Sequence, residues 1–137
     1  MNRLDLTELF FSASGRLARG GFLVAGAVLI GLTVLYEAVV SPSLHWITGV
    51  FFYPLVLFAA ACVLAKRLHD RGRNGWWAAL ILLALVAVWP WPTDFWDFPF
   101  AVVIVWAIID LAVIPGEQGT NRFGGNPLSP AAAGPAG

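Results

Sequence analysis

Arg67-Leu68-His69-Asp70-Arg71-Gly72-Arg73-Asn74-Gly75-Trp76-Trp77 is the densest polar segment of the chain, and long hydrophobic runs flank it on both sides. Such a segment must connect two apolar elements, so it sets where those elements meet. The rest of the chain is organised around residues 67–77.

Composition indicates that the surrounding elements lie in lipid. The hydrophobic fraction is 59% and the charged fraction 12%, against about 45–50% and about 25% in soluble domains. A soluble domain of 137 residues could not bury so much apolar surface. The seven tryptophans agree with this, because tryptophan favours the membrane–water interface. The formal net charge is zero, so bulk charge does not indicate nucleic acid as a partner.

The apolar sequence divides into four segments that we expect to cross a bilayer, at residues 21–40, 46–65, 76–91 and 98–114. The first two have the length of about 20 residues that a hydrocarbon core requires. The last two are shorter, which local thinning of the bilayer can accommodate. The predicted fold is an all-α membrane protein with four transmembrane helices in a single domain, residues 1–127. Residues 128–137, rich in Pro, Ala and Gly, are expected to form a disordered tail.

A short helix is expected before the first span. One helical face there collects the apolar side chains Leu6, Leu9, Phe10 and Ala13. A helix of this kind lies in the membrane interface. Packing beneath the bundle explains the same pattern equally well.

The basic residues predict the orientation. All eight lie on one side of the four-span arrangement: Arg3, Arg16, Arg19, Lys66, Arg67, Arg71, Arg73 and Arg122. The opposite side carries Glu37, Asp94 and Asp97 instead. Because Lys and Arg near the membrane stay on the cytoplasmic side, both termini and the central loop should be cytoplasmic.

Three blocks of the sequence resemble the bacterial inner-membrane proteins grouped as domain of unknown function 805. Residues 11–22 are similar to the family's F-x-x-x-G-R-x-x-R-x-x-F-W pattern, and residues 67–77 to R-R-L-H-D-x-G-x-S-G-W-W. Residues 119–127 are similar to G-x-N-R-Y-G-x-x-P. The departures, Leu23, Lys66, Asn74 and Phe123, are mild. The resemblance implies a multi-pass protein of the cytoplasmic membrane, and it supplies no activity.

The three blocks should emerge together on the cytoplasmic face, where they form the candidate site. Its polar side chains are Arg16, Arg19, Arg67, His69, Asp70, Arg71, Arg73, Asn74, Asn121 and Arg122. They could form a structural clasp, or they could bind an anionic lipid headgroup or a small phosphorylated ligand. Gly72 and Gly75 predict that a helix ends here, and Asn74 is expected to cap the next one.

Asp110 is the one ionisable residue plainly inside a predicted span, about one turn from its cytoplasmic end. Such a residue is a candidate proton or ion relay, although an arginine of the central loop could pair with it instead. His69 and Asp70 are adjacent and point in different directions, so we predict no catalytic residue. His45 and His69 lie on opposite sides of the membrane, so we predict no metal site, and no cofactor is indicated.

Two classes of function follow. In the first, the protein is a structural or interaction protein of the inner membrane that binds lipid headgroups or partner helices. In the second, it is a small transporter or channel that uses Asp110, acting as a homo-oligomer. We do not expect an enzyme.

Reporter fusions test the orientation. We expect a periplasmic reporter to be active after Pro42 or Asp94 and inactive after Asn74, because the central loop is the one of the three connecting loops that carries basic residues. The measurement is reporter activity in intact cells. An active periplasmic reporter at Asn74 would overturn the topology.

Overall fold

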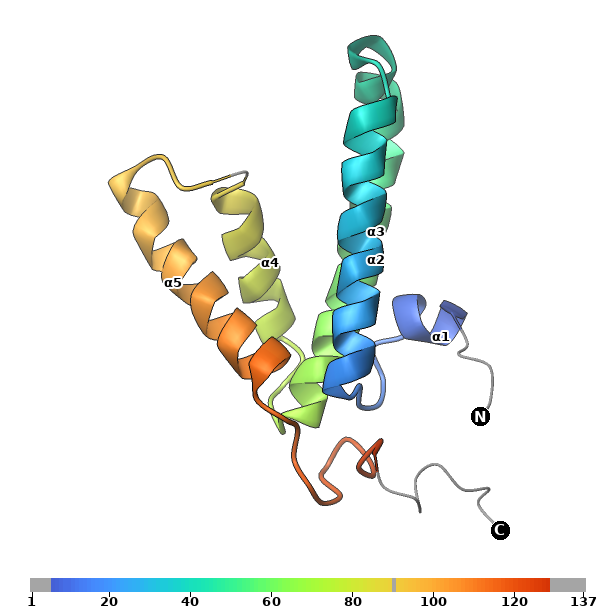
Figure 1. Ribbon diagram of the computed structural model, residues 1–137, viewed down its shortest axis with the longest axis vertical. Coiled ribbons are helices and arrows are strands. Elements are labelled where there is room, and N and C mark those ends of the chain that lie inside the picture. Colours follow the sequence, from blue (N-terminus) through green and yellow to red (C-terminus); the bar gives the residue numbers. More distant parts are fainter. Residues whose placement is uncertain (1–5, 90, 129–137) are drawn as a thin grey trace.

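The computed structural model of the protein describes residues 6–89 and 91–128, and the regular structure in these ranges is helical (Figure 1). The elements are α1 (Leu6–Phe11), α2 (Arg19–Val39), α3 (Pro42–Asp70), α4 (Trp77–Ala87), the 3₁₀ helix η1 (Phe95–Asp97), α5 (Phe98–Ala107) and the π-helix η2 (Ile108–Val113). Of the predicted tail, only Leu128 falls within the described residues.

Three helical stretches are long and apolar enough to cross a membrane: Arg19–Val39, Pro42–Asp70 and Phe95–Val113. The helical structure and these apolar stretches fit the predicted all-α membrane protein. Trp77–Ala87 is an apolar helix of only 11 residues, which rises about 16 Å along its axis. The fourth crossing and the cytoplasmic termini stay predictions.

The helices form two hairpins that diverge from a common base (Figure 1). Helices α2 and α3 lie side by side in the longer hairpin, and α4 and α5 form the shorter one. The hairpins meet where α3 contacts α4 and where α2 contacts η2. A core of Leu68, Ala78, Ile81, Ala107 and Leu111 fills this junction.

Small side chains allow α2 and α3 to approach closely, as is common where helices pack in lipid. Ala25 of α2 has no exposed surface and packs with Val63 of α3 and Leu9 of α1. Lys66 Nζ donates hydrogen bonds to the carbonyls of Glu8 and Leu9. Because these carbonyls lie near the end of α1, where helical partners run out, the lysine fixes α1 against α3. The expected N-terminal helix thus packs on the bundle, and its contact with the membrane interface stays a prediction.

Helix α3 extends beyond the predicted span at both ends, with Pro54 inside it. Pro42 occupies its first turn, where its missing N–H costs nothing. At the other end Gly72 adopts φ +72°, and Arg73 N donates to Leu68 O at 2.8 Å. This is the Schellman ending that glycine favours, and it agrees with the helix end predicted at Gly72.

Asn74 does not cap α4, so that prediction is wrong. Trp76 occupies the N-cap position. Asn74 Oδ1 accepts a hydrogen bond from Trp76 N at 3.0 Å, and Asn74 O accepts one from Trp77 N at 3.3 Å. The chain makes a tight turn before it becomes helical, and the asparagine stabilises that turn.

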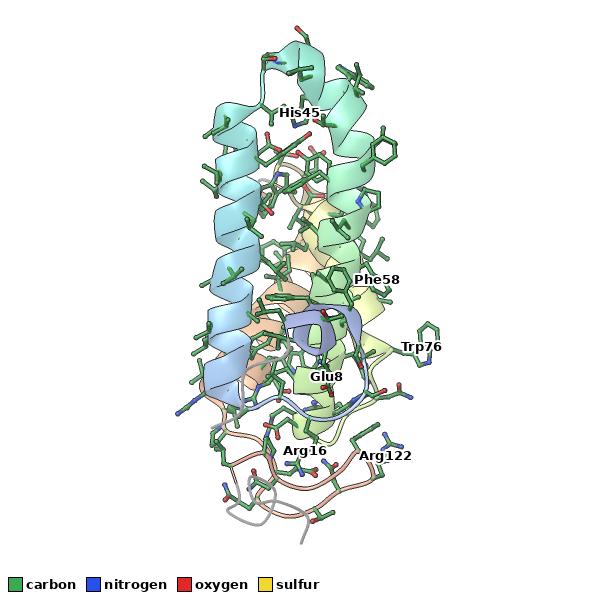
Figure 2. All side chains as sticks on the ribbon, turned by 90° about the vertical axis from the view of Figure 1, so that its right-hand side faces the viewer. Glu8, Arg16, His45, Phe58, Trp76 and Arg122 are labelled. Carbon is green, nitrogen blue, oxygen red and sulfur yellow. The ribbon has the colours of Figure 1, made fainter. Side chains whose placement is uncertain are left out.

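A separate polar cluster lies at the far tip of the longer hairpin, where Figure 2 shows His45. His45 Nε2 lies 2.9 Å from Tyr53 Oη and 3.3 Å from Glu37 Oε1. Tyr53 also donates to Glu37, and the ring of Tyr36 stacks on Phe52 at 4.0 Å. These contacts link α2 to α3 at the end opposite the base.

Replacing Ala25 by leucine should weaken the longer hairpin. The larger side chain has no room between α2 and α3, so we expect the free energy of unfolding in detergent micelles to fall by about 1–3 kcal/mol. Ala27→Leu is the matched control, because Ala27 is exposed on the same helix. Equal stability of the two variants would contradict this packing.

Candidate functional site

The base where the hairpins meet holds the three sequence blocks that were expected to emerge together. Figure 2 shows Arg16 and Arg122 at this end of the molecule, far from His45. The polar side chains come from the segment before α2, from the end of α3 and the loop that follows it, and from η2 and the loop after it. Two groups of ionic contacts form here, and each consists of one aspartate between two arginines.

Arg67 is the centre of the first group and has no exposed surface. Its Nε donates to Leu111 O at 2.7 Å and its Nη2 to Ile114 O at 2.6 Å. Nη1 donates to Leu17 O at 3.3 Å and to the carboxylate of Asp70. One side chain thereby ties α3 to the end of η2 and to the segment that leads into α2.

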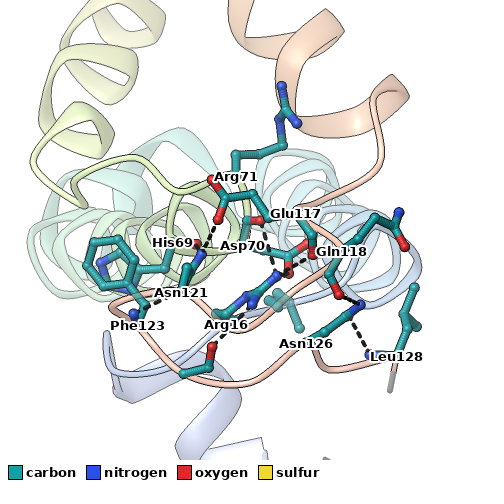
Figure 3. Close-up of polar contacts among 12 residues, drawn as sticks. Arg16, His69, Asp70, Arg71, Glu117, Gln118, Asn121, Phe123, Asn126 and Leu128 are labelled. Carbon is teal, nitrogen blue, oxygen red and sulfur yellow. Dashed lines mark hydrogen bonds and ion pairs between the residues drawn. The ribbon is translucent and has the colours of Figure 1, made fainter. Parts of the chain in front are cut away.

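Arg16 completes the first triad, Arg16–Asp70–Arg67. Figure 3 shows Arg16 beside Asp70. Its Nε donates to Asp70 Oδ1 at 3.1 Å, and its Nη2 donates to Glu117 O at 2.6 Å. Nη1 donates to Gly119 O at 2.7 Å and to Gly124 O at 3.2 Å. The loop after η2 is therefore fastened to α3 through one guanidinium.

The first triad is almost fully buried, with side-chain exposures of 1% for Arg16, 4% for Asp70 and 0% for Arg67. Buried charges are tolerated only when both pairing and hydrogen bonding are complete. The planar guanidinium, with five N–H donors, suits carbonyls that arrive from several directions. A lysine in the place of Arg67 could not reach the same set.

Glycine makes the close approach of the loop possible. A Cβ on Gly116 would clash with the Asp70 carboxylate and come within 2.9 Å of Asp70 O. This closeness lets Glu117 N donate to Asp70 O at 2.8 Å. On Gly72 a Cβ would meet the Glu117 carboxylate.

The second triad is Arg71–Asp110–Arg73, and it is less buried. Arg71 Nη2 lies 2.9 Å from Asp110 Oδ1, and Arg73 Nε lies 3.0 Å from Asp110 Oδ2. Side-chain exposure is 6% for Asp110, 19% for Arg71 and 38% for Arg73. Among the described residues, Arg71 Nε is the one buried side-chain polar atom that lacks a hydrogen-bond partner. Arg73 also lies over the ring of Trp106, 5.3 Å from its centroid.

His69 and Asp70 are held by different partners. His69 Nδ1 lies 2.9 Å from Gly15 O, and its ring stacks on Phe123 at 3.9 Å. Asn121 Nδ2 donates to His69 O at 2.9 Å and to the Glu117 carboxylate at 2.8 Å (Figure 3). The histidine and asparagine thus connect all three blocks without forming an acid–base pair with Asp70.

The remaining predicted site residues lie at the margin. Arg19 is exposed and donates to Val113 O at 2.7 Å. Arg122 is exposed over the ring of Phe123, with 4.6 Å to the ring centroid. The side chain of Asn74 accepts a hydrogen bond within the turn before α4 and belongs to neither triad.

Sequence reasoning missed Glu117 and Trp106 as partners. Glu117 is a lone carboxylate close to a basic block, which is the signal that could have identified it. Trp106 carried no such signal, because any of the seven tryptophans could have met an arginine. Within the described part of the chain, no three His, Cys, Asp or Glu side chains converge as metal ligands would.

Comparison with known proteins assigns the chain to a family. Residues 10–125 match the family described as "Protein of unknown function (DUF805)". The chain is 33% identical to the uncharacterized protein YiiR of Escherichia coli strain K12, over 88% of this chain and 89% of that protein. The YiiR of Escherichia coli O157:H7 matches equally well. No solved structure matches.

Adding one methyl group at Gly116 should disrupt the first triad. We expect Gly116→Ala to lower the free energy of unfolding by about 3 kcal/mol, because the loop must move and leave a buried charge less well paired. Gly119→Ala is the matched control, since a Cβ there meets nothing within 4 Å. Thermal unfolding in detergent compares the two variants, and equal midpoints would contradict the close approach at Asp70.

Proposed function

The chain belongs to the DUF805 family of proteins of unknown function, and from that premise we propose a lipid-binding protein of the bacterial inner membrane. It crosses the membrane four times with both termini in the cytoplasm, and its basic cytoplasmic end binds anionic lipid headgroups. The first triad holds the hairpins together. The lipid-binding surface consists of Arg19, Arg71 and Arg73, which surround η2.

The distribution of charge along the molecule supports this orientation. The arginines of both triads lie at the base, whereas Glu37, Asp94 and Asp97 belong to the opposite ends of the hairpins. Basic residues next to apolar helices favour the cytoplasmic side. Helix α4 is short for a complete crossing, and a locally thinner bilayer accommodates it.

The second triad is the observation that carries the proposal. Its two guanidinium groups share one carboxylate, so one positive charge remains uncompensated. Arg73 is partly exposed, and Arg71 Nε has no partner among the described residues. Basic groups close to a membrane surface attract anionic lipids, and guanidinium groups bind phosphate through strong charge-assisted hydrogen bonds.

The first triad is a poor candidate for the same role. The donors of Arg16 and Arg67 go to carbonyls and to Asp70 within the protein. A ligand would have to displace these bonds. We therefore propose a structural clasp for this triad and lipid binding for the surface around η2.

A relay or catalytic role has less support. Both carboxylate oxygens of Asp110 accept hydrogen bonds from arginines, which leaves no free oxygen for a transported proton or ion. We propose no catalytic step, because His69 and Asp70 have separate partners.

Lipid enrichment tests the proposal. Protein purified from bilayers of phosphatidylglycerol and phosphatidylethanolamine should retain more of the anionic lipid than the bilayer contains. Arg19→Gln combined with Arg73→Gln should reduce this enrichment, by about fivefold for each residue if each contributes about 1 kcal/mol. Raising the salt concentration should reduce it too, because salt screens exposed charges.

Arg122→Gln is the matched control. It removes an exposed arginine that contacts Phe123 and not η2. The proposal fails if the wild-type protein shows no enrichment, or if the control loses as much as the double variant.

A further inference from the structure

We infer that one phospholipid of the cytoplasmic leaflet occupies a defined seat on α5, with an acyl chain in an apolar groove and its phosphate at Arg73. This inference rests on the proposed lipid binding and adds the place, the stoichiometry and the part played by the acyl chain. The seat combines an apolar groove with a positive charge at one end of it.

The groove runs along α5 and the start of η2 and has a volume of about 460 Å³. It is lined by Phe98, Ala101, Val102, Val105, Trp106 and Ile109. These positions recur every three or four residues, so they share one face of the helix. From Phe98 to Ile109 the helix rises about 16 Å, which matches the ~15 Å hydrocarbon thickness of a single leaflet.

The positive charge lies at the end of the groove nearest the base. Trp106 lines the groove, and the Arg73 guanidinium lies over its ring at 5.3 Å from the centroid. Asp110, which follows Ile109 in the chain, holds Arg73 in place through Nε and Nη2, at 3.0 and 3.2 Å. A chain in the groove would therefore lead to a partly exposed and oriented guanidinium.

Charge complementarity selects the occupant. The second triad keeps one positive charge, and a phosphodiester carries one negative charge. The positive charge is what remains after Asp110 pairs with both Arg71 and Arg73. A helix from a second copy could fill the apolar groove, but it would leave the guanidinium without an anion. A phospholipid fits both parts of the seat, because its acyl chain can fill the groove and its phosphate can pair with Arg73.

Native mass spectrometry of the full chain in mild detergent tests the inference with three probes. They are phosphatidylglycerol, a diacylglycerol with the same acyl chains, and glycerol phosphate. We expect one tightly bound phosphatidylglycerol per chain and weak binding of the other two. Tight glycerol phosphate binding would show that a headgroup alone suffices, and tight diacylglycerol binding would show that the phosphate is not needed. Either result would overturn the seat, as would a dimer that binds no lipid.

Two pairs of variants locate the seat. Arg73→Gln removes the phosphate partner, and Val102→Trp fills the groove at a residue 57% exposed. Each should weaken binding by about tenfold or more, as expected for the loss of a charged hydrogen bond or of a fitted chain. Arg122→Gln and Val34→Trp, the latter at a residue 58% exposed on α2, should bind like the wild type.

The outcomes separate the inference from the function on which it rests. If Val102→Trp binds like the wild type while Arg73→Gln binds weakly, the headgroup function stands and the groove is overturned. If neither variant differs from the wild type, the seat is overturned, and the enrichment measurement decides the function independently.

Discussion

The buried guanidinium of Arg67 is the constraint on which the base of this protein depends. A charge with no exposed surface must have every donor satisfied inside the protein. The acceptors come from three places: the segment before α2, the carboxylate of Asp70, and the end of η2. Each of them must lie within hydrogen-bond distance of one side chain. The position of Arg67 therefore decides how the two hairpins meet, and apolar packing fills the space around it.

The end of η2 supplies the carbonyl oxygens to which the arginines donate hydrogen bonds. The last carbonyls of a helix have no partner within the helix, and cations are favourable there. Leu111 O and Ile114 O accept from Arg67, and Val113 O accepts from Arg19. Two of the basic residues from which the orientation is predicted thus also cap a helix. Among the described residues, no such polar contacts join the hairpins beyond the base, and α4 and α5 consist of apolar residues. The hairpins diverge there in Figure 1.

The clustering at the base could be predicted from the sequence, because basic residues that flank apolar spans gather on one side. The pairing of particular arginines with particular aspartates could not be predicted from the sequence. Arg16 and Asp70 are 54 residues apart, and Arg73 and Asp110 are 37 apart. Which arginine meets which aspartate depends on the positions of backbone carbonyls, which residue types do not reveal. The divergence of the hairpins was equally hidden, since an all-apolar helix has no polar face that would show its direction. Asn74 misled for a local reason, because a turn and a helix cap favour the same side chain.

The two triads have the same composition and different capacities, and depth explains the difference. In the first triad, the buried N–H groups of both arginines must donate to acceptors within the protein. These guanidinium groups therefore stabilise the fold and are not available to a ligand. In the second, the partial exposure of Arg73 removes that requirement, and one positive charge remains beside the apolar face of α5. Stability and lipid binding should therefore respond to different arginines. A structural clasp and an anion site were alternatives at the level of sequence, yet one base can hold both when its charges lie at two depths.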